Sequence, residues 1–294
     1  MDNTSSRPLE FLQGKGPLSQ IVLAVVLAVL LYIIMVSLEA VYLSYQQVSH
    51  TQTRIDDRTL NSENNSTIYS VNPKTADGNK NYRDLRVSDN ERTGIEYSYS
   101  CFLLINESTF EEGTSGMKHI FSKGNEKLFP LLSPGVFMNS NSNTLVIFQS
   151  SSDTWYNKTE VENIPIGKWF HLVVLAKNNA VEVYINGNLS SKLTMGKGVL
   201  YQNYQNLSLF SRQKTTSLNL KNASMPSIPE NNIFDVRGPI SGQISRFNYF
   251  SYALSYTQIR DLMNQGPNPI TAQENQDKPP YFVDNWWTGT GLLM

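Results

Sequence analysis

Residues 164–189 read IPIGKWFHLVVLAKNNAVEVYINGNL, and this stretch decides the fold. Residues 169–175 are almost all aromatic or aliphatic, which is typical of a strand, and Lys177-Asn178-Asn179 supplies a turn. In residues 181–185, Val, Val and Ile alternate with Glu and Tyr, which gives a second strand one buried face. Asn186-Gly187 then fits a type I′ turn, because Asn and Gly reach positive φ at least cost. The stretch therefore predicts an antiparallel β-meander.

The composition argues against nucleic-acid and metal binding. The chain has 294 residues, 17% of them charged, and its formal net charge is −1. Such a chain lacks the positive electrostatic potential that attracts the phosphates of nucleic acids. His50, His119 and His171 stand far apart, without metal-ligand spacing. Cys101 is the only cysteine, and its apolar neighbours indicate a small buried side chain rather than a reactive thiol. We expect no nucleic-acid partner, no metal and no cofactor.

An apolar stretch near the N-terminus predicts a membrane span. No charged residue occurs between Lys15 and Glu39, and residues 21–36 are nearly unbroken Ile, Val, Leu and Ala. As a helix, this run is long enough to cross about 30 Å of hydrocarbon. It exceeds the apolar core of a cleaved signal peptide, and residues 37–40 make a poor cleavage site. We predict an uncleaved signal-anchor helix over residues 18–43 that contacts the lipid membrane.

The charges beside this helix predict its orientation. Arg7 and Lys15 precede the span, and no Lys or Arg follows it until Arg54. The positive-inside rule then places residues 1–17 on the cytoplasmic side of a single-pass membrane protein. Everything after Glu39 would lie on the far side.

A polar segment follows the span. Residues 44–93 are rich in Asn, Ser, Thr, Asp, Lys and Arg and contain few large apolar side chains. Such a composition cannot bury a core of its own, so we predict a stalk that is either a linker or an arm ordered by a partner. N-glycosylation sequons begin at Asn64, Asn65, Asn106, Asn157, Asn188, Asn206 and Asn222. They become acceptors only if this side meets the glycosylation machinery.

Residues 94–269 predict a globular all-β body. About ten short apolar runs alternate with turn residues, and the single convincing helix begins at Ser255. Ser255 and Gln258 have the spacing of a capping box, and Gly266-Pro267 ends the helix. This profile is typical of a two-sheet antiparallel jelly-roll sandwich with one short helix.

Four separate elements carry a family resemblance. They are GKWFHL at 167–172, VEVYING at 181–187, GQISRF at 242–247, and ALS at 253–255 ahead of Ile259. In order and spacing they resemble the laminin-G-like branch of the concanavalin A-like lectin/glucanase superfamily, over residues 94–269. The resemblance implies a jelly roll in which Trp169 and the strand after it fill the core.

The order of the segments carries a second resemblance. The chain combines a membrane span, a polar stalk, this domain and an aromatic tail. In this architecture it is similar to single-span proteins encoded by large DNA viruses of algae and protists, and some of those proteins are minor components of the virion. This resemblance implies a structural role in the virion, as a minor capsid protein that tethers the capsid to an inner membrane. Its partners would then be other virion or capsid proteins.

The sequence carries no catalytic signature. Glucanases of the superfamily use paired carboxylates on one strand, arranged as Glu-x-Asp-x-x-Glu. Glu111 and Glu112 are adjacent and would point to opposite sides of a strand, while Glu160 and Glu162 share a face but lack a third partner. We interpret Glu160 and Glu162 as the solvated side of an edge strand and expect no enzyme and no catalytic residues.

A glycan site would come from loop residues. Asp153, Trp155, Tyr156 and Asn157 combine an aromatic pair with a carboxylate and an amide, which suit sugar C–H faces and hydroxyls. The alternative is a hydrophobic anchor for the loop. Calcium, common among laminin-G-like relatives, needs several converging oxygens, and Asp153 alone does not provide them.

The tail, residues 270–294, forms a further candidate contact. Tyr281, Phe282, Trp286 and Trp287 either pack on their own sandwich or bind a partner, since exposed aromatics are strong interface anchors. Our first hypothesis is a non-enzymatic, membrane-anchored virion protein. The alternative is a membrane-anchored lectin, and the third is a glucanase-like hydrolase.

Overall fold

The computed structural model describes residues 17–49, 51–88, 94–111, 115–128, 131–154, 156–196, 198–215 and 234–272. The chain divides into two compact units, residues 1–50 and residues 51–294. Each unit is described by itself.

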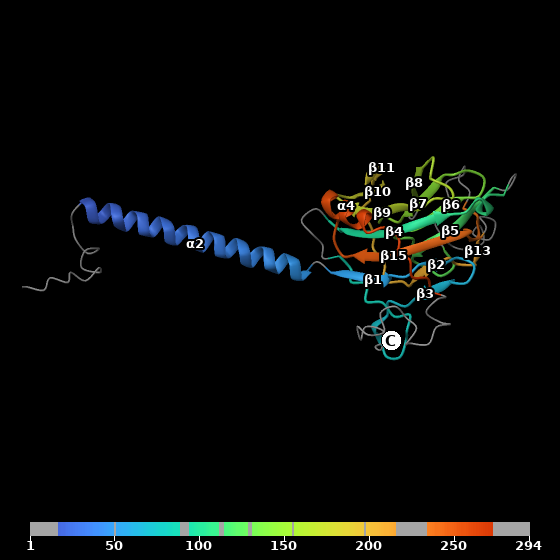
Figure 1. The fold of residues 1–294 in the computed structure, drawn as a ribbon, viewed down its shortest axis with the longest axis horizontal. Helices are drawn as coiled ribbons and strands as arrows, with labels where there is room; N and C mark the ends of the chain where they lie inside the picture. The colour runs from blue at the N-terminus through green and yellow to red at the C-terminus, as the bar shows by residue number, and fades with distance from the viewer. Residues whose placement is uncertain are drawn as a thin grey trace, which may run out of the picture. The chain divides into compact units, whose positions relative to one another are not determined.

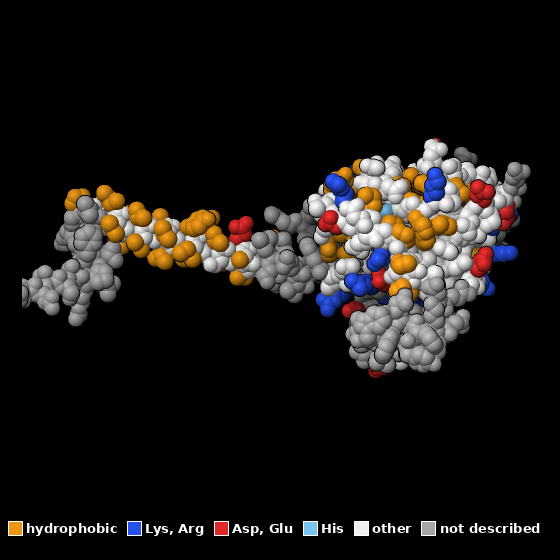
Figure 2. Space-filling model, viewed as in Figure 1, with side chains coloured by type: hydrophobic (Ala, Val, Ile, Leu, Met, Phe, Trp, Pro, Cys, Tyr) orange, Lys and Arg blue, Asp and Glu red, His pale blue; other side chains and the backbone are white. Residues whose placement is uncertain are grey.

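The first unit contains one long helix, α2 (Pro17–Ser49). Residues Gln20–Tyr42 are long and apolar enough to cross a membrane, a property that an anchor shares with a signal sequence. Figure 2 shows hydrophobic side chains along the helix, and Ile21 and Met35 are 64% and 71% exposed. Ser37 donates its hydroxyl to the Ile33 carbonyl, which satisfies this polar group without water. The helix extends six residues beyond the predicted end at 43.

The second unit is a sandwich of two sheets (Figure 1). The first sheet has the strand order β1-β15-β4-β9-β10-β11, with β2 also paired to β15. Its strands are β1 (Gln52–Asp56), β2 (Leu60–Asn61), β4 (Tyr97–Ile105), β9 (Phe170–Lys177), β10 (Ala180–Ile185), β11 (Asn188–Thr194) and β15 (Gly242–Phe250). All of its described pairings are antiparallel.

The second sheet has the order β13-β14-β5-β6-β7-β8, with β12 paired to both β5 and β3. Its strands are β3 (Thr67–Tyr69), β5 (Met117–Lys123), β6 (Gly135–Asn139), β7 (Leu145–Gln149), β8 (Asn157–Val161), β12 (Leu207–Leu209), β13 (Lys214–Thr215) and β14 (Val236–Pro239). β14 runs parallel to β5, whereas the other described pairs are antiparallel. The predicted two-sheet sandwich is confirmed, with this one parallel pair added.

The predicted meander is confirmed in its strands and its turns. β9 pairs with β10, and β10 pairs with β11. Asn178 and Asn179 have φ of 51° and 55°, and Asn186 and Gly187 have φ of 50° and 77°. Both two-residue turns therefore place both central residues in the left-handed region that a type I′ turn requires.

The main core lies between the sheets and follows the two-residue period of the strands. Alternate residues of β4, among them Tyr99, Cys101 and Leu103, belong to this core and are at most 1% exposed. The expectation of a buried Cys101 is confirmed. Trp169, by contrast, is partly exposed and lies outside the core clusters. The main-core residues of β9 (Phe170–Lys177) include Phe170, Leu172 and Val174, and Trp169 falls between the positions of that two-residue alternation.

The region expected to be a stalk is largely part of the sandwich. β1 and β2 pair with β15, and β3 pairs with β12, so residues 51–69 contribute to both sheets. Ile55, Leu60 and Tyr69 are at most 3% exposed in the main core. The prediction of a polar linker over 44–93 is corrected for a physical reason: a few apolar residues at inward strand positions suffice when other strands supply the rest of the core.

Apolar clusters also cover the outer face of each sheet. Helix α4 (Tyr256–Asn264), which has the predicted Ser255/Gln258 capping box, packs Ile259 against Val173 and Leu175 of the first sheet. On the second sheet, Leu128, Leu132 and Phe234 belong to a cluster with Phe137 and Phe148. The described part of the sandwich thus packs apolar side chains on both outer sheet faces as well as between the sheets.

Two buried histidines lead us to expect that acid destabilises the sandwich. His119 accepts from the Ser211 amide, and His171 Nε2 lies 2.9 Å from Ser100 Oγ, while His171 Nδ1 has no hydrogen-bond partner in the structure. Burial lowers the pKa of His119 to about 3 and that of His171 to about 4. Below pH 6.5 both histidines are therefore protonated in the unfolded chain but remain neutral in the folded chain until the pH approaches their lowered pKa values.

We expect stability to be greatest above pH 6.5 and to fall as the pH drops towards 4. At pH 5 each histidine should cost about 2 kcal/mol, since one pH unit corresponds to about 1.4 kcal/mol. Urea unfolding between pH 7 and pH 5 measures this slope. The variant His171→Gln should lose less stability over the same interval, and an unchanged slope would contradict the assignment.

Candidate binding site at one end of the sandwich

The loops at one end of the sandwich are hydrogen-bonded to one another. We call this end the rim and define it by residues 61–63, 106–111, 139–144, 162–169 and 239–241. The Asn106 amide donates to the Ser241 carbonyl at 2.9 Å, and the Gly167 amide donates to the Ile105 carbonyl at 2.8 Å. Further backbone bonds join Glu111 to Ser140 and Ile164 to Asn143. The rim is therefore built by long-range contacts between short loops.

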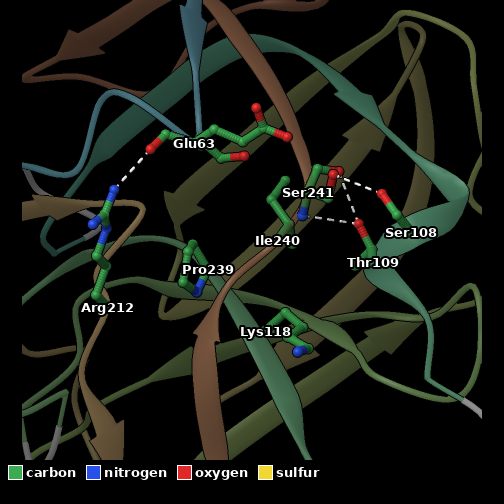
Figure 3. A pocket seen from close by; sticks show the side chains of 9 residues that line it. Glu63, Ser108, Thr109, Lys118, Arg212, Pro239, Ile240 and Ser241 are labelled. Atoms are coloured by element: carbon green, nitrogen blue, oxygen red, sulfur yellow. Dashed lines mark hydrogen bonds between the residues drawn. The ribbon is translucent and has the colours of Figure 1, made fainter.

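A polar pocket of about 260 Å³ opens at the rim. Five chain segments line this rim pocket, which consists of Ser62, Glu63, Ser108, Thr109, Lys118, Arg212, Pro239, Ile240 and Ser241. Figure 3 shows Arg212 and Glu63 on one side and Ser108, Thr109 and Ser241 on the other, with Lys118 and Pro239 between them.

Hydroxyl groups fix the Ser241 side of the rim pocket. Thr109 donates its hydroxyl to the Ser241 carbonyl at 2.8 Å, and the Ser241 amide donates back to Thr109 Oγ1 at 3.0 Å. Ser108 donates to Ser241 Oγ at 2.8 Å. The turn between β14 and β15 is thereby held in place before any ligand arrives.

Charged groups mark the other side of the rim pocket. Arg212 donates to the Glu63 carbonyl at 2.7 Å. Lys118 Nζ lies 2.7 Å from Glu111 Oε1, and this hydrogen bond is the main cause of the lowered pKa of the Glu111 carboxyl. The Lys118 side chain is only 11% exposed, which fixes its ammonium group near the pocket.

A second, more open hollow of about 550 Å³ adjoins the same loops. It is lined by the apolar side chains of Phe110 and Ile166 and by the polar side chains of Glu107, Asn141, Ser142 and Asn143. Phe110 and Ile166 also pack against the main core. An apolar surface beside amide groups suits a ligand with both C–H faces and hydroxyls.

The loop predicted as a glycan site lies at the opposite end of the sandwich. Tyr156 is 7% exposed and packs edge-on against Phe148, with ring centroids 5.2 Å apart, so it anchors the loop. Asn157 donates its side-chain amide to the Gln149 and Thr154 carbonyls and to Ser151 Oγ. Both side chains therefore stabilise the loop.

Asp153 is the exposed member of this predicted site. The hydrogen bond from Ser151 Oγ is the main cause of its lowered pKa, and the Gly198 backbone adds to it. Trp155 lies outside the described residues, as do Tyr281, Phe282, Trp286 and Trp287 of the tail.

The carboxylate considered above as a possible catalytic group, Glu160, lies at the edge of the second sheet. Glu160 is exposed on β8, which is an edge strand, and pairs with Lys158 at 2.9 Å, as the solvated-edge interpretation expects. Within the part of the chain that the structure describes, no group of three His, Cys, Asp or Glu side chains could hold a metal ion.

Sequence reasoning missed the rim pocket. Its cations, Lys118 and Arg212, stand 94 positions apart, with Ser241 29 positions further on (212 − 118 and 241 − 212). No linear motif joins such residues. The available signal was the presence of Ser and Thr beside strand ends, as at Ser108-Thr109 after β4 and Ser241 before β15.

Known structures offer distant similarities. The receptor binding domain of botulinum neurotoxin D is 13% identical with a TM-score of 0.45, and the match covers 74% of this chain and 48% of that one. The botulinum neurotoxin D ligand binding domain in complex with N-acetylneuraminic acid is 13% identical, with a TM-score of 0.39 and coverages of 74% and 40%. This chain thus matches less than half of either structure, and at these values the likeness says nothing about its ligand.

The sequence itself matches a family profile. No curated protein matches the chain. The profile described as "Concanavalin A-like lectin/glucanases superfamily" matches residues 77–260, which is more than half of the chain. That range contains most strands of both sheets, the meander and the start of α4. The protein therefore belongs to the concanavalin A-like lectin/glucanases superfamily.

Proposed function

We propose that the sandwich is a non-enzymatic carbohydrate-binding domain, that helix α2 anchors it to a membrane, and that the rim pocket binds the saccharide. The superfamily includes both lectins and glucanases, so membership alone does not decide between binding and hydrolysis. The observation that carries the proposal is the rim pocket, where hydroxyl, ammonium and guanidinium groups from five segments surround one cavity.

The chemistry of the rim suits saccharides. Sugar hydroxyls exchange hydrogen bonds with hydroxyl and amide groups, while their C–H faces pack on apolar side chains such as Phe110. Because the loops are already hydrogen-bonded to each other, binding orders few additional groups.

The first residue of the sandwich unit lies away from the rim. Thr51, the first residue of the second unit, bonds to Ser251 beyond the end of β15, whereas Ser241 precedes the start of β15. Residue 51 and the rim thus lie at opposite ends of β15.

We infer that residues 1–17 are cytoplasmic and that the sandwich lies on the other side of the membrane, as the charges beside the helix predict.

The test is a glycan array probed with the full chain in nanodiscs of neutral lipid. The variant Ser108→Trp fills the rim pocket from an exposed position, and we expect at least a tenfold loss of binding. Ser190→Trp, on the exposed edge strand β11, is the matched control and should bind normally. The proposal fails if no saccharide binds, or if Ser108→Trp binds as well as Ser190→Trp.

The virion role expected from the sequence stays a prediction. Co-purification of the chain with detergent-treated virus particles in fixed stoichiometry would support a tether between capsid and membrane. Absence of the chain from such particles would contradict the virion role.

The glycan site predicted at Asp153 and Trp155 also stays a prediction. Loss of binding to the glycan array in the variant Asp153→Ala would favour this site over the rim pocket.

A further inference from the structure

We propose that the rim selects saccharides that carry a negative charge, either a carboxylate or a sulfate ester. The inference rests on the proposed function, because it names the class of ligand for the same pocket. It is carried by basic side chains on the strands next to the rim pocket.

Three cations occupy neighbouring strands of the second sheet. Lys214 of β13 stands directly opposite Arg237 of β14, and β14 lies beside β5, which carries Lys118. Like charges directly opposite on adjacent strands repel each other and destabilise the pair. An anionic partner at this edge would turn that repulsion into attraction.

The described carboxylates compensate only part of this charge. Glu111 pairs with Lys118, and its lowered pKa arises first from that hydrogen bond and then also from the nearby charges of Arg237 and Lys214. Glu111 is thus shared among Lys118, Lys214 and Arg237, and Glu63 brings one further carboxylate to the rim pocket itself. Among the residues that the structure describes, Arg212, Lys214 and Arg237 form no ion pair.

Arg212 connects this basic edge to the rim pocket. It lies two residues before Lys214, lines the pocket, and donates to the carbonyl of Glu63 rather than to its carboxylate. A guanidinium carries five N–H donors, so further donors remain for a carboxylate or sulfate oxygen. Ser108 and Ser241 line the other side of the same pocket, where their hydroxyls suit the neutral hydroxyls of a sugar.

The experiment compares polymers that differ only in charge. Polygalacturonate is paired with its methyl ester, and dextran sulfate with dextran, so that the two pairs separate carboxylate from sulfate recognition. We expect the full chain in neutral nanodiscs to bind at least one acidic member at least tenfold more tightly than its neutral partner. This preference should decline from 50 to 300 mM salt, because screening weakens exposed charge interactions.

Charge-matched variants locate the effect. Arg212→Gln, Lys214→Gln and Arg237→Gln together should abolish the preference for the acidic polymer. Lys177→Gln, Lys192→Gln and Arg260→Gln remove the same charge from positions outside the rim pocket and should leave the preference intact. Equal losses in the two triple variants would overturn the inference.

The remaining outcomes separate this inference from the proposed function. If neutral and acidic polymers bind equally and Ser108→Trp abolishes both, the rim binds sugar without charge selection, so the inference falls and the proposed function stands. If no polymer and no array glycan binds, the proposed function falls as well. Binding to vesicles of anionic lipid but to no acidic polymer would also overturn the inference, in favour of a lipid surface.

Discussion

A chain that begins at residue 94 is expected to remain unfolded, whereas one that begins at Thr51 should fold. The shorter chain lacks β1, β2 and β3, and with them Ile55, Leu60 and Tyr69 of the main core. Each buried side chain of this size contributes about 2–5 kcal/mol, and a domain is stable by only about 5–15 kcal/mol. Circular dichroism and urea unfolding of the two chains would show the difference.

Single substitutions test the same point without truncation. Ile55→Ala removes a fully buried side chain and should lower the free energy of unfolding by about 2–5 kcal/mol. Ile68→Ala is the matched control, because Ile68 is 46% exposed on β3, and should cost less than about 1 kcal/mol. Cooperative unfolding of the chain that begins at 94, or equal losses in the two variants, would restore the stalk interpretation.

Gly124→Ala is expected to be among the most damaging single substitutions. A Cβ at this position would lie 2.0 Å from the carbonyl oxygen of Leu131, which is backbone and cannot move aside cheaply. The same loop carries Leu128 and Leu132 onto the outer face of the second sheet. A shift of the loop would therefore loosen that cluster, and we expect a loss of about 3 kcal/mol or more.

The matched control for this substitution is Gly196→Ala. A Cβ at Gly196 meets no atom within 4 Å, and the residue is not in the left-handed region. Its replacement should change the free energy of unfolding by less than about 1 kcal/mol, because the main effect is on the unfolded chain. Urea unfolding measures both variants, and similar values for the two would show that the loop adapts to the added methyl group.

Local signals in the sequence predicted the elements that are decided by near neighbours. The turns at 178–179 and 186–187, the capping box at Ser255 and the apolar helix around 21–36 all depend on residues within a few positions of each other. The alternating pattern of the meander likewise identified the inward face of β10. Spacing between such local elements was enough to indicate the family.

The tertiary structure decided what depends on distant partners. Residues 51–69 look too polar for a core until β15 and β12 are placed beside them. The rim pocket is the clearest case, since five segments form it and none has a motif. The sequence by itself predicted the strands of the meander, their turns and the long apolar helix, because these follow from local periodicity. Only the pairing of distant strands determined the core contribution of 51–69 and the site, because that pairing brings together residues that no local pattern connects.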